Sequence, residues 1–178
     1  MSRKFIPSAV MILLMFTTTI GYAQSKTAAS SMTAIELNNS YSSVSDTLYQ
    51  MGTQWGTVLN EVMTSGEYAK LKPVRAEMEQ FIARKQKEIK ASPIIGGSEK
   101  FKEAMLSFLN FESNMTTKAF MPFEKLTAAS KTDEVNAMIA NVTTLSKGET
   151  DVLAEVQKTQ SAYATKNGFA IESTEPAK

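Results

Sequence analysis

The 178-residue chain contains no histidine and no cysteine, so its reactive side chains are carboxylates, lysines, hydroxyls and thioethers. These two absences exclude Ser-His-Asp and Cys-His nucleophilic sites, histidine-ligated haem, and zinc held by nitrogen or sulfur. They also exclude the Glu-x-x-His di-iron sites of helical bundles, disulfides, and a lipid anchor on cysteine. We therefore expect no enzyme activity and no cofactor.

Among the carboxylates, Glu149 has the clearest claim to a role, because it falls at an apolar position of its predicted helix. A buried carboxylate has a raised pKa and is a candidate site residue. However, charged side chains are seldom buried, and Gly148 would let the apolar stripe shift to Leu153, so we expect Glu149 at the surface. Five other carboxylates could serve as oxygen ligands for a hard cation, but they are scattered along the chain and no loop gathers them. We expect them on solvated helix faces: Glu36, Asp46, Glu61, Glu67 and Glu112.

Thioethers can bind soft metals, but five methionines recur at helical spacing on apolar stripes, which is typical of core packing: Met51, Met78, Met105, Met115 and Met138. We expect no bound metal. A ligand pocket between helices is the remaining candidate site, with four lining residues that otherwise form the thick middle of the core: Trp55, Phe81, Phe108 and Met115.

A long amphipathic helix must position these side chains. Eight apolar residues are spaced alternately by four and three positions, which a strand of period two cannot do. The pattern predicts a helix over 33–65, ended by Gly66 in the left-handed conformation. The eight residues are Leu37, Tyr41, Val44, Leu48, Met51, Trp55, Val58 and Val62.

Three further helices follow the same kind of pattern. The second covers 67–90, although Pro73 favours a separate turn over 67–72. Pro93 and Gly96-Gly97 break the chain, and the glycine loop lacks the lysine of a phosphate-binding loop. The third helix starts with Ser98 as its cap and ends or bends at Pro122, and a fourth runs from a capping-box-like start at 130–133 to Gly168. The sequence therefore predicts an all-α, antiparallel four-helix bundle with long helices.

The N-terminus has the three-part pattern of a secretory signal peptide. Arg3 and Lys4 precede an apolar run over 9–16, and Gly21-Tyr22-Ala23 supplies small residues before a cleavage site. The run is shorter than the roughly 17–25 residues of a membrane-spanning anchor. We expect residues 1–23 to be removed, with 24–32 a flexible lead-in, 33–168 the bundle and 169–178 a disordered tail.

Removal of residues 1–23 changes the net charge from +1 to −1. A nearly neutral protein has no overall field that attracts nucleic acid or an anionic membrane. We expect neither as a partner, and no transmembrane segment after cleavage.

Several landmarks resemble an uncharacterised family of small helical proteins that bacteria export or display at the surface. They are Gly66-Glu67-Tyr68, Pro93, Gly97, Phe101-Lys102-Glu103-Ala104, and the stretch from Gln160 through Lys166-Asn167-Gly168-Phe169. The resemblance covers most of the chain after residue 23 and implies export and a helical bundle. It implies no catalytic residues, because the family has none assigned.

These observations favour a non-enzymatic, exported helical bundle. We expect a binding or structural module in the periplasm, the envelope or outside the cell, with a macromolecular partner. The alternative is a periplasmic carrier that holds a small apolar ligand between its helices, which requires a cavity among Trp55, Phe81, Phe108 and Met115. An enzyme that uses only carboxylates, lysines or serines would need perturbed titratable groups that converge in one cleft.

Overall fold

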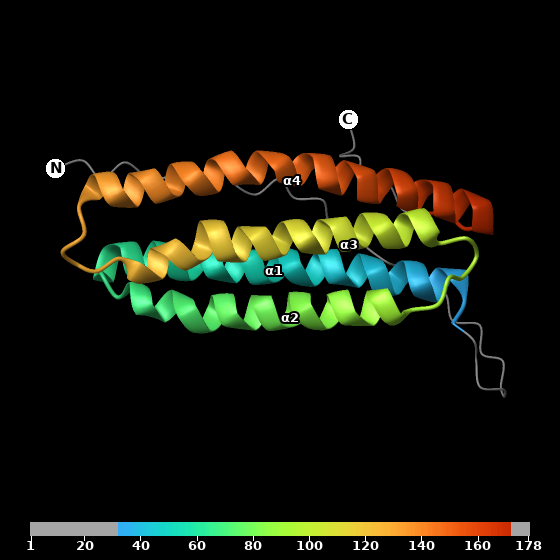
Figure 1. The fold of residues 1–178 in the computed structure, drawn as a ribbon, viewed down its shortest axis with the longest axis horizontal. Helices are drawn as coiled ribbons and strands as arrows, with labels where there is room; N and C mark the ends of the chain where they lie inside the picture. Colours follow the sequence, from blue (N-terminus) through green and yellow to red (C-terminus); the bar gives the residue numbers. More distant parts are fainter. Residues whose placement is uncertain (1–31, 172–178) are drawn as a thin grey trace.

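The computed structural model describes residues 32–171, in which every regular element is helical. Four long helices lie lengthwise beside one another in an elongated body (Figure 1). Three short helical elements also occur, η1 before α2 and η2 and η3 after α3. The all-α prediction is confirmed. The elements are α1 (Ala34–Ser65), η1 (Tyr68–Lys70), α2 (Leu71–Ala91), α3 (Glu99–Asn114), η2 (Met115–Phe120), η3 (Met121–Lys125) and α4 (Thr132–Asn167).

Some predictions concern residues outside the described part of the chain. These are the signal peptide at 1–23, almost all of the lead-in at 24–32, and positions 172–178 of the tail. Of the predicted tail, residues 169–171 are described, among them Phe169. Its ring lies 5.9 Å from that of Tyr163, in an edge-on contact.

The ends of α1 follow from its local sequence. Thr33 and Glu36 form a capping box: the Glu36 N–H donates to Thr33 Oγ1 at 3.2 Å, and the Thr33 N–H donates to Glu36 Oε2 at 2.7 Å. These bonds satisfy backbone donors that a helix start leaves open. Gly66 ends the helix with φ of 78°, a conformation that favours glycine. The predicted bounds of α1 are confirmed.

The start of α3 lies where the sequence predicts it. Ser98 is the cap residue, but its side chain makes no capping bond. Its Oγ instead accepts from the Ile95 N–H at 3.2 Å, and Ser98 is fully buried. The predicted position of the cap is therefore confirmed, but the hydroxyl bonds within the preceding loop and not to the first turn of the helix.

The chain stays helical through the residues that follow α3, but the hydrogen-bond pattern changes. Residues of η2 form a π-helix, and η3 is a 3-10 helix with Pro122 near its start. Pro122 is tolerated there because the first turn of a helix needs no N–H from it. The separate turn predicted before Pro73 is also present, as η1.

Aromatic side chains join the helices at two places along the core. Near one end, the ring of Phe101 lies 5.0 Å from that of Tyr41 and 5.7 Å from that of Tyr163. Further along, Trp55 of α1 stacks on Phe120 of η2, with ring centroids 3.9 Å apart. None of the described helices has the length and apolar character needed to cross a membrane.

Candidate functional site

The four residues of the predicted ligand pocket all lie buried within one hydrophobic core. Trp55 is packed against Phe120 and Phe123. Phe81 lies beneath the guanidinium of Arg84, 5.4 Å from its ring. One open surface groove in the described residues lies on α2, and none of the four residues lines it. The groove is lined by Ala83, Gln86, Lys87, Lys90 and Ala91.

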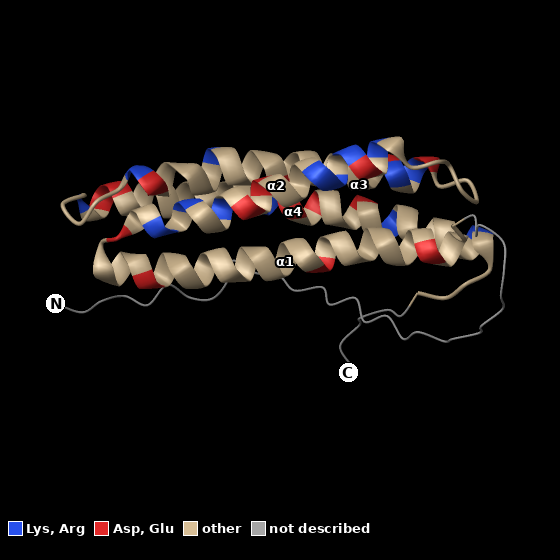
Figure 2. Cartoon of the chain, turned by 90° about the horizontal axis from the view of Figure 1, so that it is seen from below, with Lys and Arg blue, Asp and Glu red and all other residues tan. Residues whose placement is uncertain are grey.

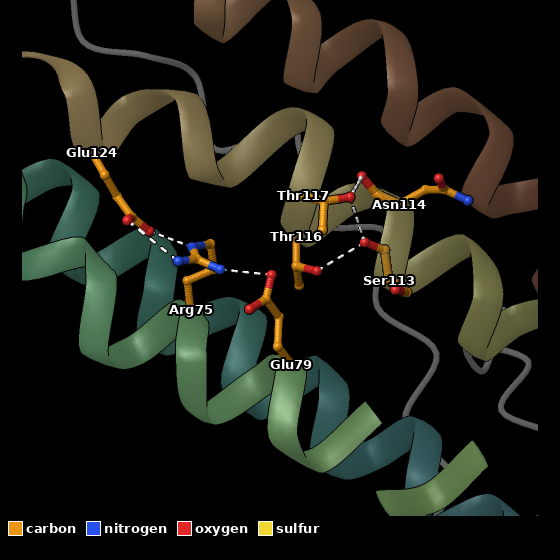
Figure 3. A network of polar contacts seen from close by, with 7 residues as sticks. All are labelled: Arg75, Glu79, Ser113, Asn114, Thr116, Thr117 and Glu124. Atoms are coloured by element: carbon orange, nitrogen blue, oxygen red, sulfur yellow. Dashed lines mark hydrogen bonds and ion pairs between the residues drawn. The ribbon is translucent and has the colours of Figure 1, made fainter. Parts of the chain in front are cut away.

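A buried arginine forms the most connected charged cluster (Figure 3). Arg75 of α2 is only 6% exposed. Its Nε and Nη2 donate to the carboxylate of Glu124 in η3, and its Nη1 lies 2.6 Å from Oε1 of Glu79. These contacts raise the pKa of Arg75, chiefly through the hydrogen bond to Glu124. Because both carboxylates hold the guanidinium in place, the cluster ties α2 to η3 and does not present a charge to a ligand.

Our sequence reasoning missed Arg75, although a signal was present. The residue falls on the apolar stripe of its helix, four positions after Leu71 and three before Met78. A charged residue at such a position needs a partner. Glu124, 49 positions away, could not be identified without the tertiary structure.

A second buried polar cluster joins α1 to α4. The side-chain amide of Gln160 donates to Asn38 Oδ1 and to Ser42 Oγ, each at 2.9 Å. All three residues are buried. Because buried polar groups are costly without partners, this cluster fixes the separation and register of the two helices at this end.

Glu112 and Glu149 correct a prediction. Both were expected on solvated surface, but both are half-buried, one on α3 and one on α4. Burial raises the pKa of Glu149, and burial together with the charge of Glu149 raises the pKa of Glu112 to about 8. Gly148 explains why: a Cβ there would lie 3.0 Å from the ring of Phe111. Because Gly148 has no side chain, α3 and α4 approach closely there, and the apolar stripe of α4 does not shift to Leu153.

The contact between α1 and α4 loosens away from Gln160. On α1, residues 42, 49, 56 and 63 share one face, because seven positions are nearly two helical turns. Ser42 contacts α4, whereas a Cβ at Gly56 would meet nothing within 4 Å. Tyr49, Gly56 and Met63 are only half-buried. We call the stretch of α1 that contains Tyr49, Gly56 and Met63 the open seam.

Element η2 accounts for the open seam, because both helices contact it. Trp55 of α1 stacks on Phe120, and the side chain of Asn141 on α4 donates to the backbone carbonyl of Lys118 at 3.0 Å. A π-helix is wider than an α-helix and often marks a functional position.

The surface beside the open seam is almost free of charge. Over its 32 residues, α1 carries only Glu36, Asp46 and Glu61, and Figure 2 shows long uncharged stretches between them. On α4, positions 135–146 carry no charged residue. By contrast, the 21 residues of α2 include nine charged ones. We call the exposed residues of 47–60 and 135–146 the neutral face.

Comparison with known protein families, curated proteins and solved structures finds no significant match. Within residues 32–171, no group of three or more acidic side chains is placed to hold a metal ion. The neutral face and its open seam are therefore the strongest candidate for a functional site in the described part of the chain.

Proposed function

We propose that this protein is an exported, non-enzymatic binding or structural module, which acts in the periplasm, the envelope or outside the cell. The neutral face carries this proposal. Charged residues are depleted at the centre of protein interfaces, and this chain concentrates its charges on other helices. The signal-peptide pattern and the resemblance to exported helical proteins support the location.

In this proposal the working unit is an antiparallel four-helix bundle. Two contacts support the arrangement. Gln160, late in α4, binds Ser42, early in α1. Ala128 lies just before α4 and Gly66 just after α1. The two pack so closely that a Cβ on Gly66 would lie 2.7 Å from the Cβ of Ala128. A rigid scaffold of this kind presents the neutral face to a macromolecular partner, and we propose no nucleic acid among its partners.

Photo-crosslinking in living cells tests the function. A p-benzoylphenylalanine at Asn60, which is exposed on the neutral face, should yield an adduct with a macromolecule. The same probe at Ala83, exposed on α2, should not. If neither position gives an adduct, or both give the same adducts, the neutral face is no binding surface.

The location is tested separately. Mass spectrometry of the periplasmic or secreted protein should find Gln24 as its first residue, since cleavage follows Ala23. Intact Met1 in a membrane fraction would contradict export with cleavage.

A further inference from the structure

Three large apolar side chains are exposed in the described part of the chain, and all three lie at one end of the molecule. They are Met32 at 44%, Ile35 at 51% and Ile94 at 47% exposed. Met32 and Ile35 lie at the start of α1, and Ile94 lies in the loop between α2 and α3. Figure 1 shows this loop, the start of α1 and the end of α4 at the same end. We call residues 32–36, 90–102 and 163–171 the tip.

Two hydrogen bonds tie the loop of the tip to its neighbouring helices. The hydroxyl of Ser92 lies 3.0 Å from that of Tyr41 on α1. The side-chain amide of Asn167 on α4 donates to the backbone carbonyl of Gly96 at 3.1 Å. The three parts of the tip are therefore held together as one surface.

The same loop holds Ile94 outward. Its neighbour Ile95 packs against the core, and the Ile95 N–H donates to the buried Ser98 Oγ at 3.2 Å. Because these contacts fix the backbone beside Ile94, its exposure follows from an anchored loop conformation.

Lysines accompany these apolar side chains. The tip contains four lysines against two carboxylates, a net charge of +2. In the part of the chain that the structure describes, no acidic side chain lies within ion-pair distance of Lys90, Lys100 or Lys166. The lysines are Lys90, Lys100, Lys102 and Lys166, and the carboxylates are Glu36 and Glu99.

We propose that the tip binds the surface of an anionic phospholipid bilayer, into which Met32, Ile35 and Ile94 insert. Burial of apolar side chains and attraction of lysines to lipid phosphates strengthen such binding together. Our expectation of no anionic membrane partner used the charge of the whole chain, an average that hides the positive tip. The inference goes beyond the proposed function, and it leaves the neutral face, along the side of the helices, open to a separate partner.

The size of the tip favours a bilayer over a protein. Four helices of about 10 Å diameter present an end of about 400 Å². This is half of the roughly 800 Å² that each partner buries in a stable protein interface. A bilayer needs no surface of matching shape, and each inserted side chain and each lysine adds to the binding.

Flotation with lipid vesicles tests the binding. Protein that starts at Gln24, without the predicted signal peptide, should float with vesicles of equal parts phosphatidylglycerol and phosphatidylcholine. It should float much less with phosphatidylcholine alone, and added salt should weaken the binding to anionic vesicles.

Variants separate the two contributions. The double variant Ile35→Ser/Ile94→Ser should weaken partition into anionic vesicles at least about tenfold, because it removes inserted apolar area. Lys100→Gln should weaken it about fivefold. Lys125→Gln, at an exposed position in η3 at the opposite end, should leave it unchanged. Circular dichroism must show equal helicity for all of these proteins.

A fluorescent label shows which end touches the lipid. Because the chain contains no cysteine, Ile94→Cys and Lys125→Cys each carry an environment-sensitive dye at one known position. With anionic vesicles, the dye at position 94 should brighten and shift to the blue, whereas the dye at position 125 should not change.

The other outcomes overturn the proposal. A helical protein that does not float with anionic vesicles has no membrane-binding tip, and equal changes of the two dyes would mean that it binds lipid along its side. Equal binding to neutral and anionic vesicles would remove the role of the lysines. A photo-crosslinking probe at Ile94 that captures a protein, without vesicle binding, would make the tip a protein contact. If vesicle binding fails while the probe at Asn60 still yields its adduct in cells, only the tip proposal fails and the proposed function stands.

Discussion

The two ends of the α1–α4 pair differ sharply, although the two helices have similar apolar periodicity throughout. At the closed end, the first half of α1 and the last part of α4 are buried at many positions. At the open end, the same helices bury few. The closed-end residues are Leu37, Asn38, Tyr41, Ser42, Val44, Leu48, Val156, Thr159, Gln160, Tyr163 and Ala164; the open-end residues are Trp55, Val62 and Val142.

The difference shows that amphipathic pattern does not decide how closely two helices pack. At the closed end, Gln160 reaches across to Asn38 and Ser42 and fixes the spacing. At the open end, each helix has a side-chain contact with η2. The neutral face lies beside the part that stays open.

The largest expected effect is at the aromatic anchor of the open end. Trp55→Ala should lower the free energy of unfolding by about 3–5 kcal/mol, because it removes a buried ring stacked on Phe120. Urea titration measures the change, with Phe101→Ala as the closed-end control of similar cost. A loss below about 1 kcal/mol would mean that the open end contributes little to the core.

The next effect concerns the buried arginine. Arg75→Leu should cost about 3 kcal/mol, because it leaves the half-buried carboxylate of Glu124 without its partner. The double variant Arg75→Leu/Glu124→Leu should recover much of the loss, since it removes both charges. If the double variant is no more stable than Arg75→Leu, the pair is not what ties α2 to η3.

A pH dependence follows from the close approach of α3 and α4. The pKa of Glu112 is raised to about 8 in the folded protein by burial and by Glu149, while the unfolded chain titrates near its ordinary value. Between these two values the folded state holds a proton that the unfolded state has lost. Stability is therefore greatest at acidic pH, falls as the pH rises toward 8, and then levels off.

Because Glu112 is only half-buried, we expect a fall of about 2 kcal/mol from this group rather than the full amount for such a shift. Thermal unfolding measured across this pH range checks it. Glu112→Gln should flatten the curve, and Glu149→Gln should shift the fall to lower pH, because one cause of the raised pKa is gone. A wild-type curve that matches Glu112→Gln would contradict the assignment.

The smallest effect is a pair of glycines that compares open with closed packing. Gly56→Ala should stabilise the protein by up to about 1 kcal/mol, since its Cβ enters open space and alanine favours a helix. Gly148→Ala should give no gain or a loss, because its Cβ would press on Phe111 at 3.0 Å. Equal effects in urea titrations would remove the distinction between the two helix contacts.

Much of the fold could be predicted from particular residues. Three local features are examples: the capping box at Thr33, the helix stop at Gly66 and the turn before Pro73. Each depends only on residues a few positions apart, so the sequence alone was enough to predict it. The core methionines Met78, Met105 and Met115 are buried as expected. The candidate site was less accessible, because the neutral face requires knowing which sides of two helices are neighbours.

The prediction for Glu149 failed for a physical reason. We expected Gly148 to let the apolar stripe shift to Leu153, but Gly148 is the position at which Phe111 of α3 comes close to α4. Protonation lowers the cost of burying a carboxylate, because it removes the charge. The sequence does not reveal whether a carboxyl group is protonated.

By itself, the sequence determined the helices and most of their ends, because helix formation depends on contacts three and four residues apart and on residue type. Only the tertiary structure decided that Arg75 binds Glu124, that Glu112 and Glu149 come close, and that Gly56 faces open space. Those contacts join residues tens of positions apart. The π-helix η2 could not be predicted either, because the spacing of apolar residues gives no sign of it.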